Sequence, residues 1–176
     1  MPTIMSHAVA AGGLASVLTT GRRLPPMFWG LCAGLAMLPD VDVVAYAFRL
    51  PSDSMWAHRG ITHSVPAAAV TVALVALLTR RRLPLSSAWL WLCLVVSMAS
   101  HGLLDMLTDG GSAVAVWATL SSSRYFWPWR PLLVSPIGVA FFSEWGVRTL
   151  RNEIGWLWLP SLLLVLLVRA GRATVR

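Results

Sequence analysis

The sequence predicts an all-α protein, a polytopic membrane helix bundle with about four to five transmembrane helices. Two observations carry this prediction. Of the 176 residues, 57% are hydrophobic and only 12% are charged, whereas about a quarter of the residues in soluble domains are charged. The apolar residues also form long runs that short arginine clusters separate. At this length we expect one integral membrane domain that covers residues 1–176.

Five apolar stretches are the candidate spans, at residues 7–20, 27–48, 65–79, 85–107 and 155–168. A helix needs about 20 apolar residues to cross the hydrocarbon core. The first, third and last stretches are shorter, and they cross only with the help of flanking residues or local thinning of the bilayer. Residues 131–143 contain two prolines and a glycine, so we interpret them as a re-entrant or interfacial segment.

The basic residues are all arginines and give a net charge of +7. They form short clusters between apolar runs rather than a basic stripe with interleaved aromatic residues, so we expect membrane anchors and no nucleic-acid partner. The positive-inside rule places the three clusters in the cytoplasm and the N-terminus outside: Arg22-Arg23, Arg80–Arg82, and Arg169, Arg172 and Arg176. The arginines of the segment between the fourth and the last span would then lie outside, against the rule: Arg124, Arg130, Arg148 and Arg151.

In this orientation, the four histidines of the chain and three of its seven acids converge on the outer face. They are His7, His58, His63 and His101 with Asp40, Asp42 and Asp105. Ionisable groups are costly at membrane depth and usually mark a functional site there. Because the orientation was set from the arginines alone, this convergence is independent evidence for a site.

Two motifs place carboxylates within the spans. His101 and Asp105 lie four residues apart, so a helix puts them on one face about 6 Å apart. Such a pair suits zinc, iron or manganese, and a structural His–Asp pair is the equal alternative. Pro39 precedes Asp40 and Asp42 and removes a helical hydrogen bond. Either the helix opens after Pro39 or only one of the two acids is a metal ligand; a helix-end cap is the alternative to a functional role.

The run His58-Arg59-Gly60-Ile61-Thr62-His63-Ser64 is the most distinctive motif of the chain. Ser64 followed by Pro66 predicts the start of a helix, because serine caps helices and proline tolerates the first turn. That explanation leaves His58, Arg59 and His63 without a role. We therefore predict that the two imidazoles bind metal.

These motifs resemble those of the YdjM-type family of bacterial inner-membrane proteins, which are described as metal-dependent hydrolases. The resemblance rests on His7, Leu38–Asp42, His58–Ser64, His101–Asp105 and the aromatic–proline segment Arg124–Trp129. It implies a multi-pass protein of the bacterial inner membrane with a metal-dependent hydrolase activity. A weaker similarity links the pattern to zinc-dependent phospholipase C, in which His and Asp ligands hold a zinc cluster.

We therefore predict a membrane-embedded hydrolase that acts at the outer face on a phosphoester, with a lipid headgroup as the first class to test. One or two divalent ions, zinc first, would bind among seven residues, more than the four ligands of one zinc: His7, Asp40, Asp42, His58, His63, His101 and Asp105. Asp42 as general base, Thr62 and Arg59 complete the expected catalytic group. Arg59 would either grip a phosphate with its planar fork or neutralise Asp40 or Asp42.

Two other functions use the same residues. A metal or proton transporter would need polar residues that continue toward the cytoplasmic half, and the third and fourth spans offer few there. A haem-binding bundle would not need the aspartates. Cys32 and Cys93 lie within apolar runs and are expected to be buried thiols rather than a disulfide or metal ligands.

Overall fold

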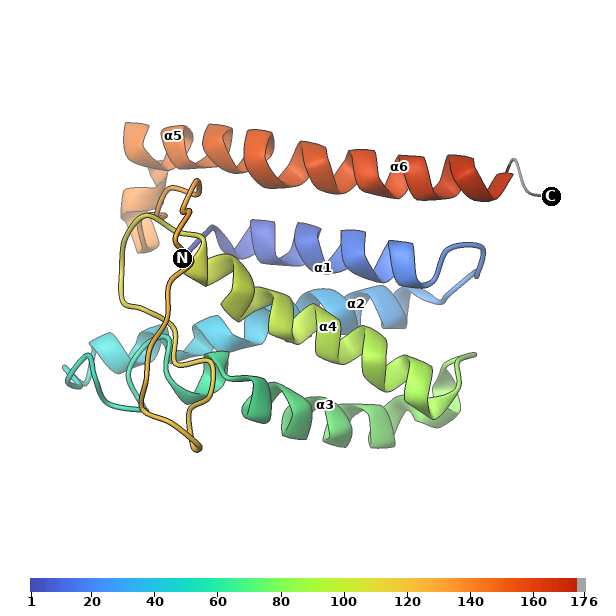
Figure 1. Ribbon diagram of the computed structural model, residues 1–176, viewed down its shortest axis with the longest axis horizontal. Coiled ribbons are helices and arrows are strands. Elements are labelled where there is room, and N and C mark those ends of the chain that lie inside the picture. The colour runs from blue at the N-terminus through green and yellow to red at the C-terminus, as the bar shows by residue number, and fades with distance from the viewer. Residues whose placement is uncertain (174–176) are drawn as a thin grey trace.

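The chain folds into a helical bundle with a crown of loops at one end, as seen in a computed structural model that describes residues 1–173 (Figure 1). Its main helices are α1 (Ile4–Leu18), α2 (Pro26–Met37), α3 (Val65–Thr79), α4 (Ser87–Met106), α5 (Glu144–Glu153) and α6 (Leu159–Ala173). Shorter helical turns are η1 (Leu38–Tyr46), η2 (Ile61–His63), η3 (Arg80–Arg82), η4 (Gly138–Phe142) and η5 (Ile154–Trp158). Residues 1–173 contain no β-strand, only isolated bridges. The predicted all-α membrane bundle is confirmed.

Within the described residues, three helical segments are long and apolar enough to cross a membrane. They are Pro26–Tyr46, Ser87–Met106 and Glu144–Arg172, with α1 as a shorter apolar helix. The expected second and fourth spans correspond to the first two. The last helix differs from its expected start, because α5, the π-helical turn η5 and α6 run on from Glu144 as one segment. Its first turns are polar, so hydropathy alone did not extend the span to them.

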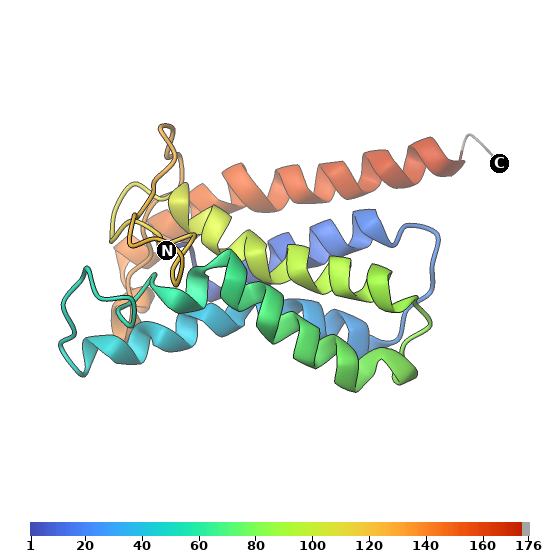
Figure 2. The ribbon, with the colours of Figure 1, turned by 60° about the horizontal axis from the view of Figure 1, so that its bottom comes forward.

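The loop crown consists of residues 107–143, between α4 and α5, and of the loop before η2 (Figures 1 and 2). Backbone hydrogen bonds tie it together, from Asp109 N to Leu132 O at 2.9 Å and from Val114 N to Tyr125 O at 3.0 Å. The segment that we expected to be re-entrant or interfacial is irregular up to Ile137 and then forms η4. The crown therefore covers the end of the bundle at which α4 ends and α1 begins.

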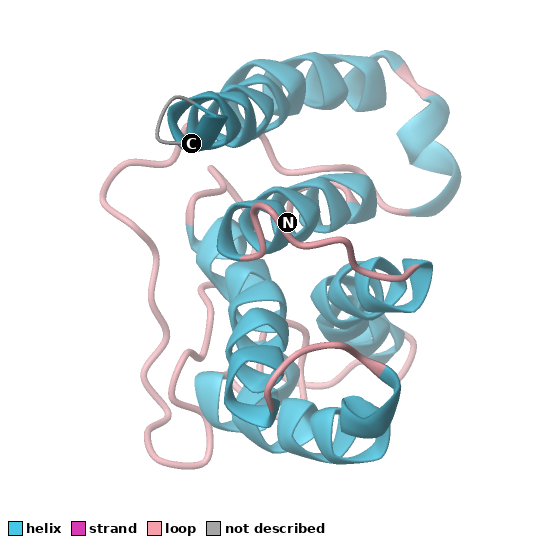
Figure 3. Ribbon diagram, turned by 90° about the vertical axis from the view of Figure 1, so that its right-hand side faces the viewer, coloured by secondary structure: helices cyan, strands magenta, loops and turns pink. Residues whose placement is uncertain are grey.

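The opposite half of the bundle has an apolar core between α1, α2, α3 and α4. Its fully buried members include Phe28, Val72, Leu90 and Leu94. Cys32 and Cys93 belong to this core as buried free thiols, as expected. Viewed from the end opposite the crown, α6 lies at one edge of the bundle (Figure 3). It packs there along α1.

The arginine clusters and the loop crown occupy opposite ends of the molecule. The turns after α1 and α3 and the C-terminal part of α6 all lie at one end (Figure 1), so the arginines at 22–23, 80–82, 169 and 172 gather there. Arg176 lies outside the described residues. The four histidines lie toward the crown, on segments that begin or end there (Figure 1). These arginines and the histidines thus lie at opposite ends of the bundle. The topology expected from the arginine clusters likewise places these two groups on opposite membrane faces.

A buried carboxylate fastens the last helix to the start of the chain. Glu153 is fully buried, and it accepts hydrogen bonds from Thr3 N (2.6 Å), Thr3 Oγ1 (2.5 Å) and Ser6 Oγ (2.6 Å). Trp158 Nε1 in turn donates to Ser6 Oγ at 2.7 Å. The N-terminal end of α1, which carries His7, is thus held in place from the side of α5 and η5.

Candidate metal centre

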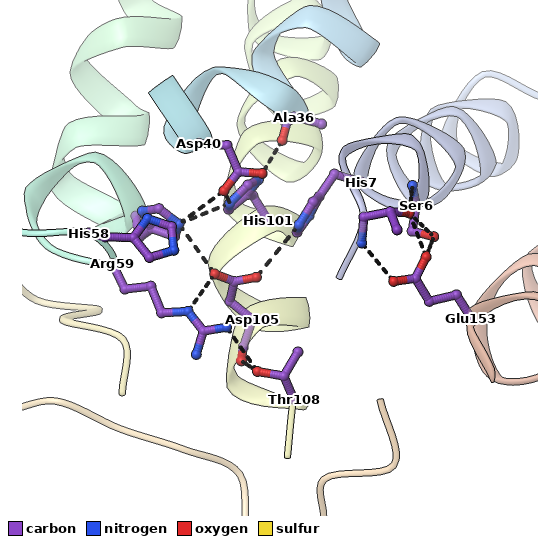
Figure 4. A network of polar contacts seen from close by, with 12 residues as sticks. Ser6, His7, Ala36, Asp40, His58, Arg59, His101, Asp105, Thr108 and Glu153 are labelled. Carbon is purple, nitrogen blue, oxygen red and sulfur yellow. Dashed lines mark hydrogen bonds and ion pairs between the residues drawn. The ribbon is translucent and has the colours of Figure 1, made fainter. Parts of the chain in front are cut away.

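The seven predicted ligands lie close together at the crown end of the bundle. Figure 4 shows five of them: His7, Asp40, His58, His101 and Asp105. Each of the seven is buried, with at most 8% of its surface exposed. The ligands come from separate parts of the chain: α1 supplies His7, η1 supplies Asp40 and Asp42, the segment up to η2 supplies His58 and His63, and α4 supplies His101 and Asp105. The site therefore exists only when these elements pack together.

Pro39 changes the helix locally, as the sequence suggested. α2 ends at Met37, and the chain continues from Leu38 as the tighter 3-10 helix η1, with the proline in its first turn. The chain thus tightens rather than breaks, and both Asp40 and Asp42 are buried toward the site.

A glycine brings η2 close to α4. The carbonyl oxygen of His63 would lie 2.7 Å from a Cβ atom on Gly102, so only glycine fits at this helix crossing. Directly after His63, the Ser64 hydroxyl accepts from Ala67 N at 3.2 Å and caps α3, which confirms the predicted helix start. The close crossing places His63 beside His101, with the two Nε2 atoms 2.9 Å apart.

The Gly102→Ala variant is expected to lose bound metal although every ligand is kept, because the new methyl group must push the His63 backbone away from α4. Metal content and melting temperature of the purified protein measure this effect. Gly34→Ala is the matched control, since no atom lies within 4 Å of a Cβ at that helical position. Equal metal content in the two variants would contradict the role assigned to this helix crossing.

The centre of the site is a four-residue cluster of Asp40, His63, His101 and Asp105. One potential ligand atom from each lies within 4.8 Å of the other three. His101 Nε2 is 3.3 Å from Asp40 Oδ1, and His63 Nε2 is 3.3 Å from Asp105 Oδ2. Two imidazoles and two carboxylates are a donor set that suits zinc, iron or manganese.

Both imidazoles of the cluster are oriented by contacts on their other ring nitrogen. His101 Nδ1 lies 2.6 Å from the carbonyl oxygen of Ala36, and His63 Nδ1 lies 3.1 Å from Asp42 Oδ2. In each ring, a proton on Nδ1 leaves the lone pair of Nε2 directed at the cluster. Metal-binding histidines are typically held in this way by a carbonyl or a carboxylate.

The carboxylates of the cluster lack ordinary hydrogen-bond donors. Among the described residues, neither oxygen of Asp40 and neither oxygen of Asp105 accepts a hydrogen bond; their close contacts are ion pairs with histidines and Arg59. Buried polar atoms are usually hydrogen-bonded, and a bound cation would satisfy these four oxygens. The residues present therefore fit a divalent metal ion.

The carboxylates around His63 favour a cation at this position. Burial alone lowers the pKa of an imidazole, but the hydrogen bonds and charges of Asp105 and Asp42 outweigh it and raise the pKa of His63 to about 9. The carboxylates around this ring therefore favour positive charge next to them.

Asp42 and His58 form an adjoining pair rather than part of the four-residue cluster. His58 Nδ1 lies 2.5 Å from Asp42 Oδ1, while Arg59 N (3.1 Å) and Thr62 Oγ1 (2.5 Å) both donate to Asp42 Oδ2. With His63 Nδ1 as a further neighbour, Asp42 is well supplied with donors. This favours Asp42 as the carboxylate that orients His58 and His63, although the three residues also form a second possible metal group.

His7 lies beside the cluster. Its ring stacks on that of His101, with centroids 3.7 Å apart, and its Nε2 is 3.5 Å from Asp105 Oδ1. In the described structure neither ring nitrogen makes a hydrogen bond. Four of the seven predicted ligands therefore form the cluster, and the other three, His7, Asp42 and His58, lie next to it.

Arg59 is fully buried, and its guanidinium group is occupied by protein atoms. Nε lies 2.9 Å from Asp105 Oδ2, so the neutralised acid is Asp105 and not Asp40 or Asp42. Three donor contacts continue into the crown, to Ser112 O (2.6 Å), Thr108 Oγ1 (2.9 Å) and Gly110 O (3.2 Å). The backbone φ of 64° is rare for a residue with a side chain and persists only where neighbours enforce it. This geometry favours a positioning role for Arg59 over a direct grip on substrate.

Two residues outside the predicted set of site residues, Thr108 and Arg124, also support the site. Thr108 is fully buried and accepts from Arg59. Arg124 donates to the carbonyl oxygens of Ser54 (2.7 Å), Ala113 (3.0 Å) and Arg59 (3.3 Å), and so clamps the loop that carries the histidines. A signal for Arg124 was present in the sequence, since this arginine breaks the positive-inside pattern.

Comparison with known proteins places the chain in a family. The sequence profile of a family described as "YdjM inner membrane protein" matches residues 1–175. "Inner membrane protein YbcI" of Escherichia coli (strain K12) is 36% identical over 169 residues, which cover 94% of this chain and 95% of the relative. No solved structure matches the chain significantly. The chain therefore belongs to the YdjM family of inner membrane proteins.

Proposed function

We propose that this protein is a membrane-embedded, metal-dependent hydrolase that cleaves a phosphoester, with a lipid headgroup as the first class to test. The observation that carries the proposal is the four-residue cluster, in which two oriented Nε2 atoms face two buried carboxylates without hydrogen-bond donors among the described residues. A bound divalent ion, zinc first, would act as a Lewis acid and lower the pKa of a water ligand toward about 7. Because Asp42 is well supplied with donors, one ion is the favoured stoichiometry.

Within this proposal, the Asp42–His58 pair moves the proton. A carboxylate bound to one ring nitrogen fixes an imidazole and stabilises it when it becomes protonated. Asp42 makes this contact with His58 Nδ1, and the Thr62 hydroxyl holds Asp42 in place. His58 is then the proton acceptor, Asp42 and Thr62 orient it, and Arg59 positions Asp105.

An apolar groove beside the cluster supports a lipid substrate. It has a volume of about 450 Å³ and lies between α1, α4 and α6, with Ala10, Leu14, Leu103, Leu104, Trp127 and Leu164 among its lining residues. Leu104 directly precedes the cluster residue Asp105, and Ala10 follows His7 by one helical turn. An acyl chain in this groove would bring its headgroup to the end of the bundle at which the cluster lies.

Transport of a metal or proton is the weaker alternative, because the bundle beyond the cluster is packed with apolar side chains. Phe28, Leu90 and Leu94 fill it and are fully buried. Two buried hydroxyls nearby, those of Ser97 and Ser100, donate to carbonyls of their own helix. A relay needs polar groups that continue across the membrane, and this core favours a site that opens to one side only.

The proposed activity is tested with detergent-purified protein, loaded with zinc or manganese and assayed on phospholipids and soluble phosphodiesters. We expect hydrolysis that a chelator abolishes and added metal restores. His58→Gln is expected to retain metal and lose about 100-fold or more of the rate, the usual contribution of a general base. Metal-bound protein that cleaves none of these substrates, or a His58→Gln variant with full activity, would contradict the proposal.

We further propose that the arginine end faces the cytoplasm and the crown faces outward, in accord with the positive-inside rule. In a variant with Cys32 and Cys93 replaced by alanine, a cysteine at the exposed position Asp53 should react with an impermeant thiol reagent in intact cells. A cysteine at the exposed position Arg81 should react only after the membrane is opened. The reverse pattern of labelling would invert the orientation.

A further inference from the structure

A pocket at the arginine end of the bundle carries an unbalanced positive charge. It has a volume of about 600 Å³ and is lined by arginines from the turn after α1 and from α6, namely Arg22, Arg23, Arg169 and Arg172, with Thr20 and Trp29. We call it the arginine pocket. Among residues 1–173, no carboxylate belongs to its lining, because the acids of the sequence lie on other segments.

The two arginines of α6 are held in place across the pocket. Arg169 donates to Ser16 Oγ at 3.0 Å, and Arg172 donates to the carbonyl oxygen of Thr20 at 2.7 Å. A guanidinium group has five N–H donors in a fixed plane, so each keeps donors for a ligand after one such contact. Preoriented arginines are the side chains best suited to bind phosphate oxygens in pairs.

An apolar groove continues from the arginine pocket along the contact between α1 and α6. It has a volume of about 320 Å³ and shares Ser16, Trp29 and Arg169 with the pocket. Toward the middle of the bundle it is lined by residues such as Val9, Gly12, Leu162 and Val165, and it reaches Trp158. A Cβ atom placed on Gly12 would meet no described atom within 4 Å, so the absence of a side chain there leaves the groove open.

We propose that the arginine pocket and this groove together bind one anionic phospholipid, with the phosphate among the arginines and an acyl chain along α1 and α6. A free phosphate would need the pocket but not the groove, and the continuity of the two therefore favours a lipid. A zwitterionic lipid would bring a cation into a lining whose described residues offer it no carboxylate. Basic pockets between membrane helices are known to select anionic headgroups in this way. The arginine pocket lies at the end of the bundle opposite the metal centre, and none of its lining residues belongs to the proposed hydrolytic site.

The test measures binding to the full-length, detergent-purified protein by native mass spectrometry and by the shift in melting temperature. The probes are phosphatidylglycerol, phosphatidylcholine of the same chain length, glycerophosphoglycerol and inorganic phosphate. We expect phosphatidylglycerol to bind and to raise the melting temperature with its concentration, as a ligand of the native state does. Phosphatidylcholine should bind at least about tenfold more weakly. A tenfold change in affinity is about the free energy of one charge-assisted hydrogen bond.

Two variants separate the headgroup from the acyl chain. Arg169→Gln combined with Arg172→Gln should weaken phosphatidylglycerol binding about tenfold or more, whereas the matched pair Arg80→Gln and Arg81→Gln, outside the pocket, should not. Gly12→Leu fills the groove while keeping every arginine, so it should weaken the lipid but leave any binding of inorganic phosphate unchanged. Inorganic phosphate as effective as the lipid, equal binding of phosphatidylcholine, or equal losses in both arginine pairs would overturn the proposal.

Discussion

Asp105→Asn is expected to remove bound metal and to cause one of the largest losses of stability of any single substitution in this chain. Asp105 is fully buried and faces three cationic or potentially cationic groups: Arg59 Nε at 2.9 Å, His63 Nε2 at 3.3 Å and His7 Nε2 at 3.5 Å. Asparagine keeps the size of the side chain and deletes its charge. Arg59 is then left buried without its counterion, which typically costs about 3–5 kcal/mol.

The same substitution removes one of the two carboxylates of the four-residue cluster, so the remaining donors hold a divalent ion less tightly. Metal content after purification and thermal unfolding with and without added zinc measure both effects. Asp109→Asn is the matched control, because the exposed Asp109 side chain accepts, within residues 1–173, a single hydrogen bond, from Val134 N at 2.8 Å. Full metal content in Asp105→Asn, in a protein that still folds, would remove this residue from the ligand set.

Arg59→Lys is expected to destabilise the protein strongly even though it preserves the charge. An ammonium group can stay near Asp105, but it cannot also reach Thr108 Oγ1 and the carbonyl oxygens of Gly110 and Ser112 in the plane of the guanidinium fork. Hydrogen bonds to charged groups contribute about 1.5–3 kcal/mol each, so the loss of two lowers the free energy of unfolding by about 3 kcal/mol or more. Metal content should fall less than in Asp105→Asn, because all four cluster residues remain.

The outcome separates two roles for Arg59. A residue that only grips the substrate would lose activity on replacement by lysine while the melting temperature stayed at the wild-type value. If Arg59 is a positioning residue, its replacement by lysine should lower the melting temperature. The remaining activity should then be proportional to the fraction of protein that is folded and metal-bound. Arg130→Lys serves as the control, since Arg130 is an exposed arginine of the same crown, in contact with the ring of Phe126. A wild-type melting temperature for Arg59→Lys would contradict the positioning role.

The sequence was sufficient to predict the fold class and to find the residues of the site, for one physical reason. In a chain with 12% charged residues, each histidine and acid within an apolar run stands out against its surroundings. His101 and Asp105 share one helix by spacing alone. The contact between His63 and His101 depends instead on the crossing of η2 and α4 at Gly102, which spacing along the chain does not encode.

Other features depended on tertiary contacts and were missed or assigned differently. The start of the last helix at Glu144 was missed because α5 is polar, although its buried end at Glu153 anchors the helix to Thr3 and Ser6. Which of Asp40 and Asp42 is the better metal ligand could also be decided only from the three-dimensional structure. Both follow Pro39, and only the arrangement of donors shows that Asp42 is already hydrogen-bonded while Asp40 is not.

The central claim is that the four-residue cluster binds a metal ion, and elemental analysis of the wild-type protein tests it most directly. The protein is purified in detergent without chelators, and its content of zinc, iron and manganese is measured against protein concentration, with Asp105→Asn treated in parallel. We predict about one divalent ion per chain in the wild type, the number that one four-ligand cluster holds, and a marked loss in the variant. A folded wild-type protein that carries none of these metals, and takes up none when each is supplied, would contradict the claim.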